Sequence, residues 1–343
     1  MLSFTMPNLS PAGCRGPELS FGDPEAEFRA ACSGMGITDN SKFGRIEVTG
    51  NDRLDLLHRL STNSLIGLRA GGVVSTVFVT DKGRIVDRVI VSSREDSLVL
   101  ITSPGTEQLL TQWIEKFTIT EDIRLNTITG DTVMASLIGP RMISMFSPML
   151  DSPSGESTSV LLAREGTNLF VVHSKDSRSD VAHIITDKDS APRLLEMLDS
   201  LPGARWIGGR AYEGFRIARG ISASPGELND EYNPFECDLR DSISFTKGCY
   251  IGQEVIARLD TYGKIRRHLA RVESPRAIPG TTPLPLSNNG MEAGTLTSMT
   301  EIPFDGKYLG LAIVRNDVAA AGDWLAAGGT GVSVLLTGNS SDN

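Results

Sequence analysis

The stretch Lys247-Gly-Cys-Tyr-Ile-Gly-Gln-Glu-Val-Ile-Ala-Arg258 places a cysteine between two glycines, directly ahead of a helical pattern. Gly248 and Gly252 permit a tight turn and a close approach of the backbone to a ligand. Residues 253–259 are expected to form a short helix that begins next to Gly252. Cys249 then lies just before the free N–H groups of that helix, where the helix dipole favours a thiolate.

The local sequence is compatible with two roles for Cys249. Lys247 and Arg258 carry positive charge close to it in the sequence, and an activated thiolate is nucleophilic and sensitive to oxidation. A free cysteine is, however, also among the residues most often buried as a small apolar side chain. The local features alone favour neither role.

The residues upstream of this stretch predict two mixed α/β regions, because apolar residues alternate in some segments and recur with helical spacing in others. In the first region, strands are expected at 45–48, 73–80, 85–92 and 97–102, and helices at 53–61 and 104–116. The turn Asp81-Lys-Gly83 is a hairpin signal between two of these strands. In the second region, strands are expected at 132–138 and 168–173 and a helix at 193–201.

The chain changes character after the second region. A helix is expected at 211–218, and an irregular stretch follows from residue 220 to residue 246. Long loops of this kind inside a compact protein are often functional. After residue 264 the chain is rich in glycine, proline and β-forming residues, in short segments spaced like the strands of a small barrel.

Composition limits the classes of function. Of the 343 residues, 40% are hydrophobic and 22% are charged, which is typical of a soluble globular protein of two or three domains. The net charge of -9 argues against a nucleic-acid partner, because such a partner requires a basic surface. No stretch approaches the roughly 20 apolar residues of a membrane helix, so no membrane partner is expected.

The cysteines and the N-terminal residues indicate the cellular compartment in which the protein is expected. Cys14, Cys32, Cys237 and Cys249 are scattered, and no Cys/His group has metal-ligand spacing, so no metal site is expected. Free thiols in a large acidic chain predict a reducing compartment. Residues 1–22 lack the patterns of a secretory signal and of a transit peptide. We therefore expect a cytoplasmic protein.

The run KGCYIGQE at 247–254 resembles the signature of the YgfZ family, Lys-Gly-Cys-aromatic-x-Gly-Gln/Glu-Glu, at all fixed positions. The similarity covers roughly residues 36–315 in the expected order. Its other segments are DNSKFGRIEVTGNDRLDLLHRLSTN at 39–63, DKGRIVDRVIV at 81–91, RIARGI at 216–221 and NPFECDLRDSISFTKGC at 233–249. The chain is thus similar to folate-binding YgfZ-type proteins of the glycine-cleavage T-protein (GcvT aminomethyltransferase) superfamily.

This resemblance implies a tripartite α+β fold, in which two α/β lobes and a small C-terminal β-barrel surround a central cavity. By this resemblance the chain divides into three parts. The first lobe comprises residues 26–130 and 205–260 and carries the signature loop, the second lobe comprises residues 131–204, and the barrel comprises residues 261–337. A loose N-terminal extension at 1–25 and a frayed tail at 338–343 complete the division.

The resemblance also implies a function. Tetrahydrofolate or a related folate is the expected cofactor, and assembly or repair of iron–sulfur proteins is the expected role. Iron–sulfur client or assembly proteins are the expected partners. Cys249, the signature cysteine of the family, and Lys247 are the residues expected to carry the chemistry.

A tetrahydrofolate-dependent aminomethyl or methyl transferase is the alternative. In T-proteins, the hairpin similar to residues 83–88 ends in two aspartates, of which the second is catalytic. Asp87 keeps the first position, whereas Arg88 replaces the second. Since an arginine cannot accept a proton and reverses the local charge, carboxylate-assisted transfer from that position is not expected.

The glutamate that grips the pterin in T-proteins, within an Arg-Leu-Glu-Ala-Gly run, corresponds to Ala218 in Arg216-Ile-Ala-Arg-Gly220. Its absence either weakens folate binding or leaves the contact with the pterin N–H donors to another acid. The acids considered for that contact are Glu213, Glu227 and Glu236.

The full set of expected folate contacts is Asn63, Arg84, Asp87, Arg216, Glu236, Gly248, Tyr250, Gly252, Gln253, Glu254 and Arg258. Several have structural alternatives: Asn63 also suits a helix C-cap, Arg84 an exposed hairpin and Tyr250 core packing. Glu254 also suits an ion pair or a solvent-facing position. The basic residues that follow the helix, Arg266 and Arg267 among them, either provide charge for a folate glutamate tail or form a solvated strand edge.

Overall fold

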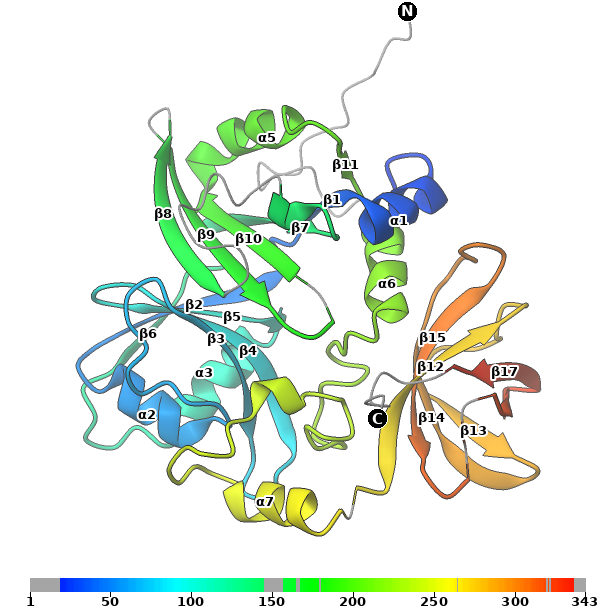
Figure 1. Ribbon diagram of the computed structural model, residues 1–343. Helices are drawn as coiled ribbons and strands as arrows, with labels where there is room; N and C mark the ends of the chain where they lie inside the picture. The colour runs from blue at the N-terminus through cyan, green and yellow to red at the C-terminus, as the bar shows by residue number, and fades with distance from the viewer. Residues whose placement is uncertain are drawn as a thin grey trace, which may run out of the picture.

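The computed structural model describes residues 19–144, 157–164, 167–178, 180–263, 265–318, 320 and 322–335. Two β-sheets and a closed C-terminal β-barrel organise these residues (Figure 1). This arrangement confirms the expected α+β fold of two lobes and a small barrel. Among the described residues, none of the helices combines the length and the apolar character that crossing a bilayer requires.

The first lobe is built on an antiparallel sheet in the order β3-β4-β5-β2-β6. Its strands are β2 (Phe43–Thr49), β3 (Val73–Val79), β4 (Ile85–Ser93), β5 (Leu98–Pro104) and β6 (Arg124–Thr127). The predicted hairpin is confirmed, since it joins β3 to β4. Helices α2 (Arg53–Leu60) and α3 (Glu107–Glu115) bury their apolar stripes against the sheet. Helix α3 begins later than expected, because Pro104 still belongs to β5.

The second lobe is built on a six-stranded sheet in the order β11-β1-β7-β10-β9-β8. Its strands are β1 (Met35–Asp39), β7 (Thr132–Ile138), β8 (Thr158–Arg164), β9 (Thr167–Lys175), β10 (Asp180–Asp187) and β11 (Ala204–Trp206). The short helix η1 (Lys188–Ser190) leads into α5 (Ala191–Asp199), which packs its leucines on the sheet. The two lobes meet through apolar residues of both sheets, including Val99, Ile101, Met134 and Phe170.

The composition of the second sheet differs from the expected division of the chain. Strand β1 at 35–39 pairs with β7 and β11, so this part of residues 26–130 lies in the second lobe. Strand β11, which spans the expected boundary between residues 204 and 205, belongs there as well. The alternation of apolar and polar residues shows that a segment is a strand, but it does not show which sheet that strand joins.

Residues 19–33, the first part of the chain that the structure describes, pack against the rest of the protein. Helix α1 (Pro24–Ser33) begins at the N-cap Asp23 and packs against α6 (Gly209–Ala218). Glu27 is fully buried, and its carboxylate accepts hydrogen bonds from Ser20 Oγ, Phe21 N and Gly208 N. The end of the expected loose extension at 1–25 is therefore docked. Residues 1–18 and the expected frayed tail at 338–343 lie outside the described residues.

The barrel is closed in the order β12-β15-β14-β13-β16-β17. Its strands are β12 (Arg267–Ser274), β13 (Leu284–Asn288), β14 (Met291–Met299), β15 (Tyr308–Arg315), β16 (Trp324–Ala327) and β17 (Thr330–Val334). The long segment between α6 and the barrel contains η2 (Arg240–Ser242) and α7 (Gln253–Thr261). This segment passes between the first lobe and the barrel (Figure 1). It therefore links all three parts around a common centre.

Candidate functional site

A cavity of about 650 Å³ lies where the two lobes and the barrel meet. Its walls come from β4, β5, the β9–β10 region, α6, residues 221–232 and β14. Apolar lining is provided by Phe43, Ile90, Ile101, Val181, Phe215 and Leu228. The lining residues with charged or titratable side chains are Lys42, Arg88, Asp176, His183, Tyr212, Glu213, Arg216, Asp230, Glu231 and Tyr232. A largely apolar cavity of this size with a few convergent polar groups is typical of a small-molecule site.

Arg88 enters the cavity, whereas Asp87 does not line it, because neighbouring residues of β4 face opposite sides of the sheet. Asp87 is buried and accepts hydrogen bonds from Ser103 N (2.9 Å), Ser103 Oγ (2.6 Å) and Thr106 Oγ1 (2.5 Å). Burial raises the pKa of Asp87, and these hydrogen bonds oppose the rise. The predicted folate contact of Asp87 is therefore replaced by a structural role at the start of α3.

Arg88 forms an ion pair with a residue of the second lobe at the wall of the cavity. Its Nη2 donates to Asp176 Oδ2 at 2.8 Å, and Asp176 lies in the turn between β9 and β10 of the other lobe. Asp176 Oδ1 also accepts a hydrogen bond from Arg178 N. The cavity thus contains a carboxylate beside Arg88, but that carboxylate comes from the second lobe.

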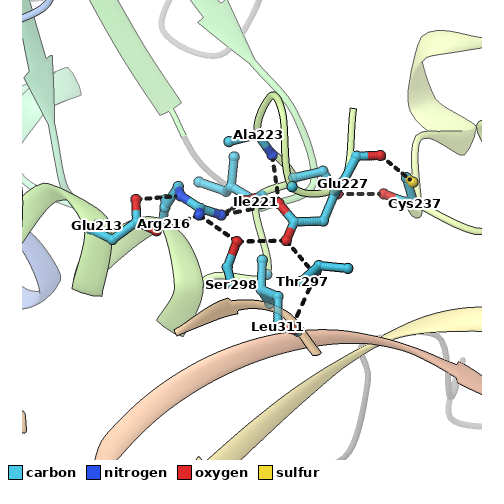
Figure 2. Close-up of polar contacts among 12 residues, drawn as sticks. Glu213, Arg216, Ile221, Ala223, Glu227, Cys237, Thr297, Ser298 and Leu311 are labelled. Carbon is cyan, nitrogen blue, oxygen red and sulfur yellow. Dashed lines mark hydrogen bonds and ion pairs between the residues drawn. The ribbon is translucent and has the colours of Figure 1, made fainter. Parts of the chain in front are cut away.

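Arg216 lies in the centre of a buried polar network that joins α6, the loop after it and β14 (Figure 2). Its guanidinium donates to Glu213, to Glu227 Oε2 (3.3 Å) and to Ser298 Oγ (2.7 Å). Glu227 is fully buried and also accepts from Ala223 N. Arg216 is therefore at the cavity, as predicted, but its donors are directed at protein acceptors.

The three acids considered as replacements for the pterin-binding glutamate occupy different places. Glu213 lines the cavity with a side chain that is 37% exposed, although it also accepts from Arg216. Glu227 is enclosed by its network, and Glu236 lies outside the cavity lining. Glu213 is consequently the acid that a ligand in the cavity can reach. Ala218, at the place of the glutamate itself, packs in an apolar cluster.

Lys247 is held by the first lobe. Its Nζ donates to the carbonyl oxygens of His58 (2.6 Å), Ser61 (2.6 Å) and Asn63 (2.8 Å), at the C-terminal end of α2. Burial lowers the pKa of Lys247 to about 8. The ammonium group therefore binds the carbonyl of His58 in the last turn of α2 and two carbonyls of the residues that follow the helix, which differs from the catalytic role expected for it.

Asn63 is a turn residue. Its Nδ2 donates to Ser75 O, and its Oδ1 accepts from Ser64 N. It does not line the central cavity, and since the C-cap of α2 is Ser61, a turn position rather than a helix C-cap describes its contacts.

The signature loop lies at the surface, immediately before α7. Cys249 and Gly248 are exposed, and a Cβ added to Gly248 would meet no atom within 4 Å among the described residues. Gly252 is the N-cap of α7 with φ +78°, and a Cβ there would lie 2.5 Å from Thr80 O. Gly252 is thus required for packing against the β3–β4 hairpin, whereas no residue that the structure describes imposes such a requirement on Gly248.

The other residues of the signature are placed around this loop. Tyr250 is half-buried in a cluster with Phe235, Ile243 and Ile256, and burial raises its pKa to about 12. Glu254 pairs with Arg258 at 2.9 Å on the exposed side of α7, and Gln253 is the first residue of that helix. No residue from 247 to 258 lines the central cavity. The structure therefore does not bring Cys249, the residue expected to carry the chemistry, to the central cavity.

Arg84 and Glu236 lie together at a second concavity between the hairpin, α7 and the barrel. They are 3.7 Å apart, and Arg84 Nη1 donates to Glu231 O. They are thus brought near one another, although away from the lining of the central cavity.

The sequence reasoning missed Asp176, His183 and Tyr212 as cavity residues. Asp176 belongs to a short polar turn, whose composition signals only a turn. His183 is buried and shares a 2.7 Å hydrogen bond with Ser136 Oγ. Within the described ranges, no three His, Cys, Asp or Glu side chains are grouped as a metal site would require.

Comparisons with known proteins agree with this architecture. The sequence model of the family described as "GCVT N-terminal domain" matches residues 3–170 of this chain. "Putative transferase At1g60990, chloroplastic" of Arabidopsis thaliana is 30% identical over 317 residues, which cover 90% of this chain and 72% of that protein. The aminomethyltransferase of Geobacillus kaustophilus is 27% identical over 316 residues, which cover 89% and 85% of the two chains.

A solved structure shows the same fold. The glycine cleavage system aminomethyltransferase T from Bartonella henselae superposes with a TM-score of 0.76 at 18% sequence identity, over 91% of this chain and 88% of that one. The sequence matches show the family: the chain belongs to the GcvT aminomethyltransferase superfamily.

Proposed function

We propose that the protein binds tetrahydrofolate, or a related folate, in the central cavity. The observation that carries this proposal is the cavity of about 650 Å³ enclosed by both lobes and the barrel. Its apolar lining suits a flat ring, and pockets of roughly 300–1,000 Å³ hold ligands of this size. Tetrahydrofolate-dependent transfer is the activity of GcvT-type aminomethyltransferases, which supports a folate as the ligand.

The cavity residues fit a pterin. A pterin presents N–H donors, and Glu213 presents a partly exposed carboxylate that can accept them in a bidentate manner. Asp176 offers a second carboxylate, and Ile90 and Phe215 offer apolar surface for the ring. A bound tetrahydrofolate would supply nitrogen atoms that carry one-carbon groups.

The more specific role that we propose is that of a YgfZ-type accessory factor in the assembly or repair of iron–sulfur proteins. Two residues of the signature motif support this role, because the contacts of the fold do not account for them. Lys247, Tyr250 and Gly252 have structural roles, whereas Gly248 and Cys249 are exposed and no contact with the described residues requires them. An exposed thiol beside a glycine is accessible to a protein partner, which fits action on a client protein.

A tetrahydrofolate-dependent transferase is the second candidate, and one observation favours it. Asp176 provides a carboxylate in the cavity, beside the arginine that replaces the catalytic acid of T-proteins. A proton-accepting group is therefore available there, although it is paired with Arg88.

Calorimetric titration of the purified protein with tetrahydrofolate tests the binding. Glu213→Gln should weaken binding about 10- to 100-fold, because a hydrogen bond to a charged acceptor contributes about 1.5–3 kcal/mol. Glu196→Gln, at an exposed position of α5, is the control and should bind normally. Absence of binding to the wild-type protein at millimolar folate would contradict the proposal.

The specific roles are separated by two variants. Cys249→Ala should keep folate affinity and lose the iron–sulfur function in a complementation assay, and full complementation would defeat the accessory role. A one-carbon transfer assay with tetrahydrofolate tests the second candidate. Turnover that disappears in Asp176→Asn would favour the transferase.

A further inference from the structure

A second concavity, of about 690 Å³, lies outside the central cavity. It is formed by the β3–β4 hairpin, residues 233–236, α7, the segment 265–267 that enters the barrel, and the end of β15. We infer that this concavity, the basic pocket, is a binding site for an organic anion with two or more carboxylate or phosphate groups.

The basic pocket has an excess of positive charge. Five cationic side chains line the basic pocket: Lys82, Arg84, Arg266, Arg267 and Arg315. Two acidic ones, Glu236 and Asp317, accompany them, which leaves an excess of three positive charges. Because the whole chain has a net charge of -9, this excess is a local feature that opposes the overall charge. Concave surfaces lined by one sign of charge concentrate ligands of the opposite sign.

The ion pairs within the basic pocket leave two of its cationic side chains without an acidic partner among the described residues. Glu236 is shared between Arg267, at 2.8 Å, and Arg84, at 3.7 Å, and Asp317 is paired with Arg315 at 2.7 Å. Both acids of the pocket are therefore engaged. Lys82 and Arg266 are exposed and form no ion pair with any residue that the structure describes. Arginine and lysine together suit multivalent anions, since arginine binds carboxylate or phosphate in a bidentate manner.

The shape and the position of the basic pocket also suit an organic anion. Val255, Leu259 and Ile265 provide an apolar side to the pocket, which suits the carbon skeleton of an organic anion. Residues 231 and 232 line the central cavity, and the carbonyl of Glu231 accepts hydrogen bonds from Arg84 (2.8 Å) and Arg267 (3.4 Å). The two concavities therefore share a wall.

Two sources can provide such an anion. It is either a free polyanion or the acidic tail of a molecule whose ring occupies the central cavity. The second source rests on the proposed folate function, whereas the first is independent of it.

The first experiment uses tripolyphosphate and citrate as probes, titrated into the full-length protein at low ionic strength. The double variant Lys82→Glu/Arg266→Glu should bind both at least tenfold more weakly than the wild-type protein. The control Arg69→Glu/Arg276→Glu changes the net charge by the same amount at exposed sites outside the pocket and should bind normally. Lys82→Ala/Arg266→Ala replaces the first variant if thermal unfolding shows that it is not folded.

The inference is overturned if neither probe binds, or if both double variants lose affinity equally. The source is determined by comparing folate monoglutamate with folate triglutamate. A gain in affinity from the longer tail that disappears in Lys82→Glu/Arg266→Glu identifies the tail as the anion, and equal affinities identify a free anion. If the probes bind but no folate does, the proposed function fails and the anion site stands.

Discussion

Arg88 of β4 and Asp176 of the β9–β10 turn form an ion pair with Nη2 and Oδ2 2.8 Å apart, and this pair joins the two lobes at the cavity wall. The side chains are 18% and 19% exposed. The positive charge of Arg88, at the position where the resemblance to T-proteins predicts a catalytic acid, is thus balanced by an acid from the other lobe. The pair has consequences for stability that can be measured directly.

We predict that Arg88 and Asp176 are energetically coupled. Arg88→Ala removes the ion pair from a partly buried Asp176 and should lower the free energy of unfolding by about 1–3 kcal/mol, less than the full cost of breaking a deeply buried pair. The double variant Arg88→Ala/Asp176→Ala should be destabilised by less than the sum of the single variants, with a coupling of about 1 kcal/mol. Urea unfolding measures all three variants, and additive effects would contradict the prediction.

Lys247 should be a structural residue. Lys247→Met removes three hydrogen bonds to carbonyl oxygens at the end of α2, and it should lower the free energy of unfolding by about 1–3 kcal/mol. Arg258→Met, which removes only an exposed pair with Glu254, is the control and should cost less than about 1 kcal/mol. A Lys247→Met protein of normal stability with an altered thiol reactivity would instead restore the catalytic role.

The two glycines of the signature should differ. Gly252→Ala forces a side chain onto a left-handed backbone and against Thr80 O, so it should destabilise the protein by about 1–3 kcal/mol. Gly248→Ala should stay within about 0.5 kcal/mol of the wild-type protein, because its Cβ meets nothing among the described residues. Thermal unfolding of the matched pair tests this difference, and equal effects would refute it.

His183 should make stability depend on pH. Burial lowers the pKa of His183 to about 4, and the charges of Arg88 and Arg45 contribute. In the unfolded chain the imidazole binds a proton near pH 6.5, whereas in the folded protein it does so only near pH 4. The unfolded state therefore binds more protons in this window, and stability should fall as the pH decreases from 6.5 to 4, by roughly 3 kcal/mol in total.

The test compares the wild-type protein with His183→Asn, which retains a hydrogen-bonding group near Ser136 Oγ but does not titrate. Urea unfolding midpoints measured between pH 4 and 7 should change less steeply in the variant. Parallel curves for the two proteins would show that His183 is not the group responsible.

Cys249 should be the most reactive of the three described thiols. It is exposed, whereas Cys32 is partly buried and Cys237 is buried with its Sγ hydrogen-bonded to Glu227 O. Brief treatment with a maleimide, followed by peptide mass spectrometry, should therefore label the Cys249 peptide before those of Cys32 and Cys237. Cys249→Ser should lose this label without a change in stability beyond about 0.5 kcal/mol. Earlier labelling of Cys237 would contradict the arrangement of the loop.

Helices and strands could be predicted from the sequence where residues that are close in the sequence determine them. The hairpin at 81–83 and helix α2 follow from turn chemistry and from the spacing of apolar residues, and both depend on neighbours in the sequence. The position of Cys249 ahead of a short helix is likewise local. The assignment of β1 to the second lobe was not predictable, since its partners β7 and β11 lie far along the chain.

The sequence by itself determined the classes of element, the C-terminal barrel and the signature loop, because periodicity and turn residues act over a few positions. Only the tertiary structure decided what the site residues do. Asp176 enters the cavity and Lys247 turns to the end of α2 because segments 88 and 184–189 residues apart are brought into contact. Such contacts follow from how two sheets and a barrel pack around one centre, and no local pattern encodes that packing.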